Sequence, residues 1–157
     1  MPNFQQTVFI LILILLDVFL KNFAENNLDR NVLIEFIPFV SFYLTSNSGI
    51  AFSLLDFNNL FTSYGILVIG MFIVFFLFKL LNDQKKSTGR LAFIFIIGGA
   101  LGNLIDRALD GEVTDFLLLY FGNISFFVFN PADFFITIGA IFFIANEISS
   151  KIKKGEQ

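Results

Sequence analysis

The chain has 157 residues, of which 56% are hydrophobic and only 15% are charged, and its mean hydropathy is +0.80. Soluble domains contain about 45–50% apolar and about 25% charged residues, so this composition indicates a membrane protein without a separate soluble domain of ordinary size. The absence of cysteine and histidine excludes thiol catalysis and Ser-His or Cys-His nucleophilic systems, and it argues against a zinc site. Carboxylates are therefore the main candidates for acid–base chemistry. The net charge of −3, with few and scattered basic residues, gives no indication of nucleic-acid binding.

Four apolar runs are long enough to cross a bilayer as helices, since about 20 residues span its hydrocarbon core. These runs are residues 6–23, 60–81, 90–107 and 132–150. The first run has no basic N-terminal region and no cleavage site of small residues, so we interpret it as a retained helix rather than a signal peptide. Within it, Asp17 and Lys21 are four residues apart and can pair on one helix face.

The segment 24–59 that follows the first span is mixed in composition. Two β-prone runs occur at residues 32–37 and 39–45. Ser46-Asn47-Ser48-Gly49 is typical of a turn, and residues 50–55 favour a short amphipathic helix lying at the membrane interface. The segment is too short to fold alone, so we expect a small surface subdomain attached to the helices.

The end of the third span combines small residues with polar ones. The glycines between residues 98 and 102 allow a neighbouring helix to approach closely. Asn103, Asp106 and Arg107 then share one helix face, where such groups are costly in hydrocarbon. A helix end that reaches for lipid headgroups would explain Arg107, but it explains Asn103 poorly because that residue lies one turn deeper.

The second external segment, residues 108–131, carries β-prone runs at 113–120 and 124–129. It ends in Asn130-Pro131-Ala132-Asp133, where the fourth span begins. Asn130 suits the N-cap, Pro131 the first helical position, and Asp133 complements the helix dipole.

Basic residues predict the orientation of the spans. The positive-inside rule places both termini and the loop between the second and third spans in the cytoplasm, and both β-prone segments outside. The cytoplasmic set is Lys79, Lys85, Lys86, Arg90, Lys151, Lys153 and Lys154, against Lys21, Arg30 and Arg107 on the other side.

Asp115 and Asp133 belong to the external connection between the third and fourth spans, so we expect both at one membrane surface. Two close carboxylates share one proton. The ionised member can then activate water while the protonated member polarises a peptide carbonyl, which is aspartic-protease chemistry. Taken singly, Asp133 is equally well explained as a helix-capping acid and Asp115 as a loop acid. A small transporter or proton-path subunit, and a purely structural membrane subunit, are the alternatives.

Together these segments resemble the lipoprotein signal peptidases (signal peptidase II), which are bacterial membrane aspartyl proteases. The resemblance covers nearly the whole chain and rests on five matching features, namely Asp17 with Lys21, and the stretches 47–53, 98–107, 113–116 and 130–133. It implies a single peptidase domain over residues 1–157. We therefore expect an all-α membrane protein with four transmembrane helices, a small extracytoplasmic β-rich cradle and a short interfacial helix, lying in the bacterial cytoplasmic (inner) membrane.

The resemblance also implies the roles of particular residues. Asp115 and Asp133 would be the catalytic dyad at the extracytoplasmic face. The residues expected to line or support the site are Asn103, Arg107, Asn130, Asn47, Gly49, Asp17, Lys21 and Asp106. Two positions depart from the usual family pattern, Val18 where glutamine is common and Pro131 where a small or β-branched residue is usual, but neither is a dyad carboxylate.

The resemblance further implies the substrates and partners. The family cleaves prolipoproteins whose lipobox cysteine already carries diacylglycerol, and the cut falls just before that cysteine. Membrane lipids and globomycin-type inhibitors are the other expected partners, and no metal or organic cofactor is implied.

Overall fold

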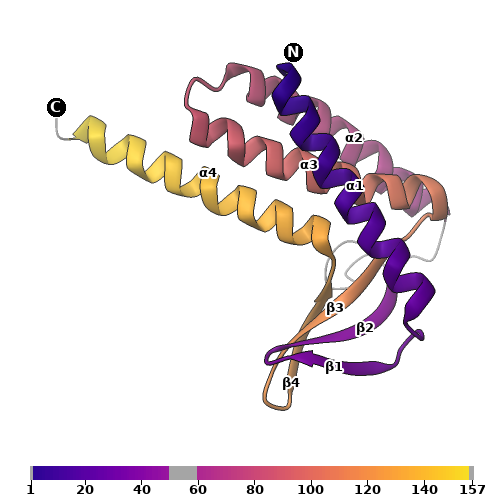
Figure 1. Ribbon diagram of the computed structural model, residues 1–157. Coiled ribbons are helices and arrows are strands. Elements are labelled where there is room, and N and C mark those ends of the chain that lie inside the picture. The colour runs from indigo at the N-terminus through magenta and orange to yellow at the C-terminus, as the bar shows by residue number, and fades with distance from the viewer. Residues whose placement is uncertain (1, 50–59, 156–157) are drawn as a thin grey trace.

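The computed structural model describes residues 2–49 and 60–155. Its four helices are α1 (Phe4–Asn27), α2 (Leu60–Asp83), α3 (Ser87–Asp110) and α4 (Pro131–Gly155) (Figure 1). All four are long and apolar enough to cross a membrane, which confirms the four predicted spans. The helices extend up to a few residues beyond the predicted runs, because polar residues at the ends continue the helical hydrogen bonding.

The central element is α3, which contacts each of the other three helices. Its buried residues form the hydrophobic core with residues of α1, α2 and α4, namely Ile10, Leu13, Val74, Leu81, Phe93, Ile94, Ile97 and Phe135. Large apolar side chains on the outer faces of the helices remain exposed, as is expected where lipid is the solvent.

Glycines in α3 bring the other helices close, as the small residues in this span predicted. A Cβ atom on Gly99 would collide with the carbonyl oxygen of Ala132 in the first turn of α4. A Cβ atom on Gly102 would lie 2.5 Å from Asp17 Oδ2 of α1. Side chains at these two positions would therefore separate α3 from the polar residues of its neighbours.

The strands β1 (Leu33–Ile37), β2 (Val40–Asn47), β3 (Val113–Phe121) and β4 (Ile124–Phe129) form one antiparallel sheet in the order β1-β2-β3-β4. The pairing of β2 with β3 joins the segment between α1 and α2 to the segment between α3 and α4 in a single layer. The sheet lies at the end of the bundle where α1 and α3 end and α4 begins, while both termini lie away from it (Figure 1).

The predicted turn at residues 46–49 is wrong in its first half. Ser46 and Asn47 belong to β2, because they pair with Thr114 and Val113 of β3. The expected interfacial helix at residues 50–55 lies outside the described residues.

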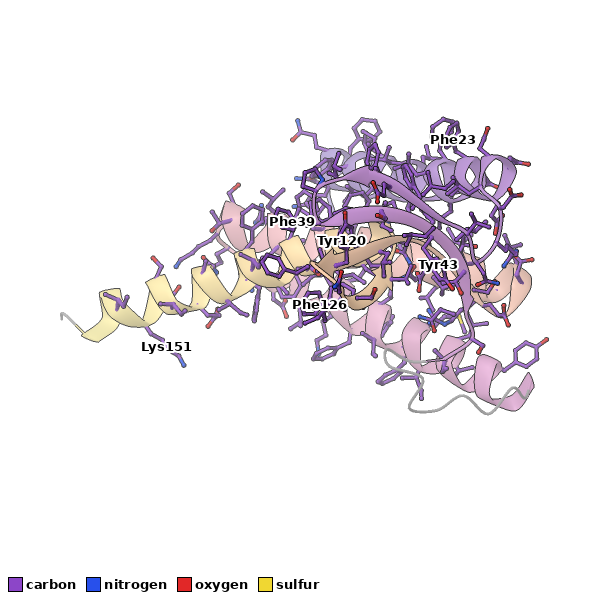
Figure 2. The ribbon with its side chains drawn as sticks, turned by 90° about the horizontal axis from the view of Figure 1, so that it is seen from below. Phe23, Phe39, Tyr43, Tyr120, Phe126 and Lys151 are labelled. Carbon is purple, nitrogen blue, oxygen red and sulfur yellow. The ribbon has the colours of Figure 1, made fainter. Side chains whose placement is uncertain are left out.

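Aromatic side chains gather at the hairpin end of the sheet. Phe39, between β1 and β2, stacks on Phe121 at the end of β3, with ring centroids 5.7 Å apart and an interplanar angle of 8°. Figure 2 shows Phe39, Tyr120 and Phe126 near one another in the view from below. All five residues of β1 are exposed. The sheet thus presents apolar surface outside its own small core.

Candidate active site

A cavity of about 590 Å³ lies between the sheet and the adjoining ends of α3 and α4. Seven of the ten sequence-predicted site residues line it, namely Asn47, Gly49, Asn103, Arg107, Asp115, Asn130 and Asp133. The other three, Asp17, Lys21 and Asp106, connect to it through one buried ion-pair network. Residues from both strand-bearing segments and from two helices therefore meet at a single site.

Asp115 lies in β3 and is only 3% exposed. Its Oδ2 accepts a hydrogen bond from Asn47 Nδ2 at 3.1 Å, and its Oδ1 accepts one from Asn130 Nδ2 at 2.6 Å. Burial raises the pKa of the Asp115 carboxyl to about 6, and the charge of Asp133 acts in the same direction, while amide donation from Asn47 opposes the shift. A group whose pKa lies near the working pH can both accept and donate a proton, and the raised pKa brings the Asp115 carboxyl closer to neutral pH.

Asp133 lies in the first turn of α4. Its Oδ1 accepts a hydrogen bond from Asn103 Nδ2 at 2.8 Å, and its Oδ2 accepts one from the backbone N–H of Asn130 at 3.3 Å. In return, the Asp133 N–H donates to Asn130 Oδ1 at 3.0 Å. Asn130 therefore caps α4 as predicted and also contacts both aspartates. Asp133 therefore takes part in the cap of α4 and also lines the cavity.

Lys21 is the centre of the network behind the cavity. Its Nζ lies 2.8 Å from Asp17 Oδ2, 2.9 Å from Asp106 Oδ2 and 2.9 Å from Asn103 Oδ1. Lys21 is 3% exposed and Asp17 is fully buried. The predicted pairing of Asp17 with Lys21 is thus present, but it is one part of a larger network.

The same network ties the helices together. Asp17 Oδ1 accepts the backbone N–H of Ala132 at 2.8 Å, which joins α1 to the first turn of α4. Asp106 Oδ2 accepts the N–H of Thr114 at 3.3 Å, which joins the end of α3 to β3. A buried charge needs such compensation, since an unpaired one is strongly destabilising.

Arg107 lines the cavity. Its Nη2 donates to the carbonyl oxygen of Gly49 at 3.1 Å, while its buried Nε has no partner among the residues that the structure describes. The guanidinium charge acts on both Asp115 and Asp133. Arg107 therefore provides positive charge at the cavity wall.

Sequence reasoning missed the apolar wall of the cavity. This wall is formed by four consecutive β4 residues, Phe126, Phe127, Val128 and Phe129. The β-prone pattern found the strand, but only the pairing of β4 with β3 brings it beside Asp115. No group of three or more histidine, cysteine or acidic side chains within residues 2–49 and 60–155 is arranged to hold a metal ion.

Residues 9–149 match the family model of signal peptidase (SPase) II. The chain belongs to the signal peptidase II family. The match covers most of the sequence, including every candidate site residue. It confirms the resemblance inferred from the motifs and sets aside a transporter or a purely structural subunit.

Relatives and solved structures agree with this family. The lipoprotein signal peptidase of Bartonella bacilliformis is 40% identical over 92% of this chain and 87% of that protein. The lipoprotein signal peptidase of Brucella ovis is 38% identical over 90% of this chain and 88% of that protein. The fold is similar to two solved bacterial membrane enzymes.

The first of these structures has a TM-score of 0.86 at 26% identity, covering 98% of this chain and 93% of the other. The second has a TM-score of 0.78 at 27% identity, covering 90% and 91%. The family and the four apolar helices together make the chain a multi-pass membrane protein with a protease fold.

Proposed function

We propose that this protein is a membrane-embedded aspartyl endopeptidase acting on diacylglyceryl-modified prolipoproteins, which it cuts just before the lipidated cysteine. Signal peptidase II membership makes the removal of signal peptides from lipoproteins its activity. One observation supports the aspartic type of mechanism. Asn130 contacts both Asp115 and Asp133, so the two carboxylates meet at one cavity in a chain without cysteine or histidine.

The proposed reaction uses water as the nucleophile. The ionised carboxylate of the pair accepts a proton from water as its oxygen forms a bond to the scissile carbonyl carbon. The protonated carboxyl donates a hydrogen bond to the carbonyl oxygen, which gains negative charge in the tetrahedral intermediate. The C–N bond then breaks, and a proton passes to the leaving nitrogen. Burial keeps the proton on Asp115 up to about pH 6.

The position of the site suits a substrate that is itself anchored in the bilayer. The cavity lies where the helices meet the sheet, and its β4 wall is apolar. A prolipoprotein presents its signal helix and acyl chains within the membrane, so the scissile bond would reach this depth without leaving lipid. Globomycin-type inhibitors would occupy the same cavity, and membrane lipids would cover the outer faces of the helices.

The orientation of the protein follows from the positive-inside rule. Both termini would be cytoplasmic, and the sheet and cavity would lie at the extracytoplasmic face of the inner membrane. Residues 1–157 would form one peptidase domain. The two strand-bearing segments would form a clamp over the substrate. Because β2 and β3 are already paired in one sheet, the clamp would close as one layer over the helix ends. A cross-link between the sheet and the start of α4 should therefore stop cleavage, and persistent cleavage would exclude the clamp.

The decisive experiment is cleavage of a diacylglyceryl-modified prolipoprotein by the purified protein in detergent, followed by gel mobility. We expect a mobility shift with the lipidated substrate and none with a substrate that lacks the diacylglyceryl group. Mass spectrometry of the product should show the lipidated cysteine at its N-terminus. Equal cleavage of both substrates would contradict the proposed specificity.

A further inference from the structure

Three asparagine side chains contact the two aspartates, and each has its carbonyl oxygen held by a group that can only donate. Asn103 Oδ1 accepts from the Lys21 ammonium at 2.9 Å. Asn130 Oδ1 accepts from the Asp133 N–H at 3.0 Å, and Asn47 Oδ1 accepts from the Gly49 N–H at 3.1 Å. Neither an ammonium nor a backbone N–H can accept a hydrogen bond, so these contacts determine the orientation of each amide.

The consequence is that all three amides present N–H groups to the aspartates. Asn47 and Asn130 donate to Asp115, and Asn103 donates to Asp133. The backbone N–H of Asn130 is a further donor to Asp133, and Arg107 in the cavity wall carries donors only. None of these contacting groups offers an acceptor oxygen to a proton on the pair.

We propose that Asn47, Asn103 and Asn130 are positioning residues that act as one-way donors. They offer the proton of the Asp115–Asp133 pair no amide acceptor, which favours donation of its O–H to the other carboxylate, to water or to the substrate carbonyl. This inference rests on the proposed function. A flipped amide would offer its oxygen instead and would hold the proton in an unproductive hydrogen bond.

The charged groups around the three amides come from α1, α3, β3 and α4, since β2 and β4 carry none. On α1 these are Asp17 and Lys21, on α3 Asp106 and Arg107, on β3 Asp115, and on α4 Asp133. Lys21 bridges Asp17 and Asp106 and still reaches Asn103. The amide orientation at Asn103 is therefore maintained by an ion-pair network that does not itself line the cavity.

Replacement of each asparagine by aspartate tests this directly, because the two side chains have the same shape. In Asn47→Asp, Asn103→Asp and Asn130→Asp, one oxygen can keep the contact with Gly49 N–H, Lys21 or Asp133 N–H. Only the N–H that faces the catalytic pair is lost. When the new acid is protonated, its O–H can donate in place of that N–H, so acidic pH should restore the interaction. The alanine variants at the same positions remove the donor without adding charge. We expect them to stay impaired at every pH, and wild-type kcat/KM from them would show that only the added charge of the aspartate matters, which would overturn the inference.

We expect kcat/KM of each variant to fall by about 10- to 100-fold at neutral pH, as the loss of a donor to a charged group predicts. At acidic pH it should recover toward the wild-type value, which moves the pH optimum down by about one unit or more. Asn146→Asp is the matched control, because Asn146 Oδ1 accepts from the Thr88 hydroxyl at the other end of α4, far from the cavity. Its pH profile should coincide with that of the wild type.

Thermal unfolding in detergent across the same pH range separates the remaining outcomes. A variant that is stable at acidic pH but unstable at neutral pH supports the inference, since the ionised acid then faces the pair. If a folded variant shows the same pH dependence of kcat/KM and of Tm as the wild type, the inference is overturned. The same holds for a variant that folds at neither acidic nor neutral pH. If the wild type does not cleave the substrate, the proposed function fails, and the pH dependence of unfolding still decides whether the amides are one-way donors.

Discussion

Asn130 Nδ2 lies 2.6 Å from Asp115 Oδ1, so the residue that caps α4 also holds the carboxylate of β3. Asn130 is fully buried, and its backbone and side chain both contact Asp133 as well. The start of the last helix and the geometry of the two aspartates are therefore one structural unit. A shift of α4 along its axis would change the separation of the carboxylates directly.

Removal of either carboxylate should stop proteolysis without unfolding the protein. In Asp115→Asn and Asp133→Asn the shape is kept, but the pair can no longer share a proton and activate water. We expect processing to fall by about 100-fold or more, the usual contribution of general acid–base catalysis. Gel mobility of the lipidated substrate measures the rate, and Asp110→Asn, at the exposed last residue of α3, is the control. A wild-type cleavage rate from either variant would contradict the assignment of Asp115 and Asp133 as the catalytic pair.

The raised pKa of Asp115 predicts a pH dependence of stability. Its pKa rises from 3.8 to about 6 on folding, so between these values the folded protein binds the proton more tightly than the unfolded chain. The contribution of this group to the free energy of unfolding is therefore full below about pH 4 and is lost as the pH rises through about 6. The difference in Tm between the wild type and Asp115→Asn, measured in detergent, should decrease over this range. A difference that increases with pH would show that the carboxyl is stabilised in its charged form.

Loss of the Lys21 ammonium should be strongly destabilising. Lys21→Met would leave the buried Asp17 and the half-buried Asp106 without a cation, at a cost of about 3–5 kcal/mol for a broken buried pair. The double variant Lys21→Met/Asp17→Asn removes one of the two uncompensated charges and should recover part of the loss. Thermal unfolding measures both. Lys151→Met, at an exposed position near the other end of α4, should leave Tm unchanged (Figure 2).

The close contact of α3 with α4 can be tested by adding one methyl group. Gly99→Ala would force the Ala132 carbonyl away from α3, and this displaces the first turn of α4 that carries Asp133. We expect a lower Tm together with reduced cleavage. Gly65→Ala is the matched control, because a Cβ there meets no atom within 4 Å in the described structure. In a helix interior that change should stabilise by about 1 kcal/mol. Equal effects of the two changes would contradict the close-packing role of Gly99.

Local pattern was sufficient for the four long helices and for the positions of the four strands. Apolar runs gave the four helices and β-prone runs gave the four strands, because both depend on the composition of short segments. The same holds for the pairing of Asp17 with Lys21 and for the N-cap at Asn130, which are set by spacing within one helix. The resemblance of the motifs to a known family then predicted which residues meet at the cavity.

Contacts between distant segments could not be predicted in this way. Lys21 and Asn103 are 82 residues apart, and only the packing of α1 on α3 brings them together. The turn at Ser46 and Asn47 was wrong for a similar reason, since pairing with β3 extends β2 through two residues whose own preference is for a turn. Contacts between distant segments determine the structure at such positions, and a short stretch of sequence carries no information about those contacts.

The hydrogen bond from the Ala132 N–H to Asp17 Oδ1 joins residues 115 positions apart, near the two ends of the chain. Asp17 is synthesised early, but this contact cannot form until the last helix has inserted. Asp133 is synthesised with the same helix, so a nascent chain that ends before α4 has only Asp115 of the pair and an incomplete network. Proteolytic competence is thereby delayed until biosynthesis of the enzyme is nearly complete.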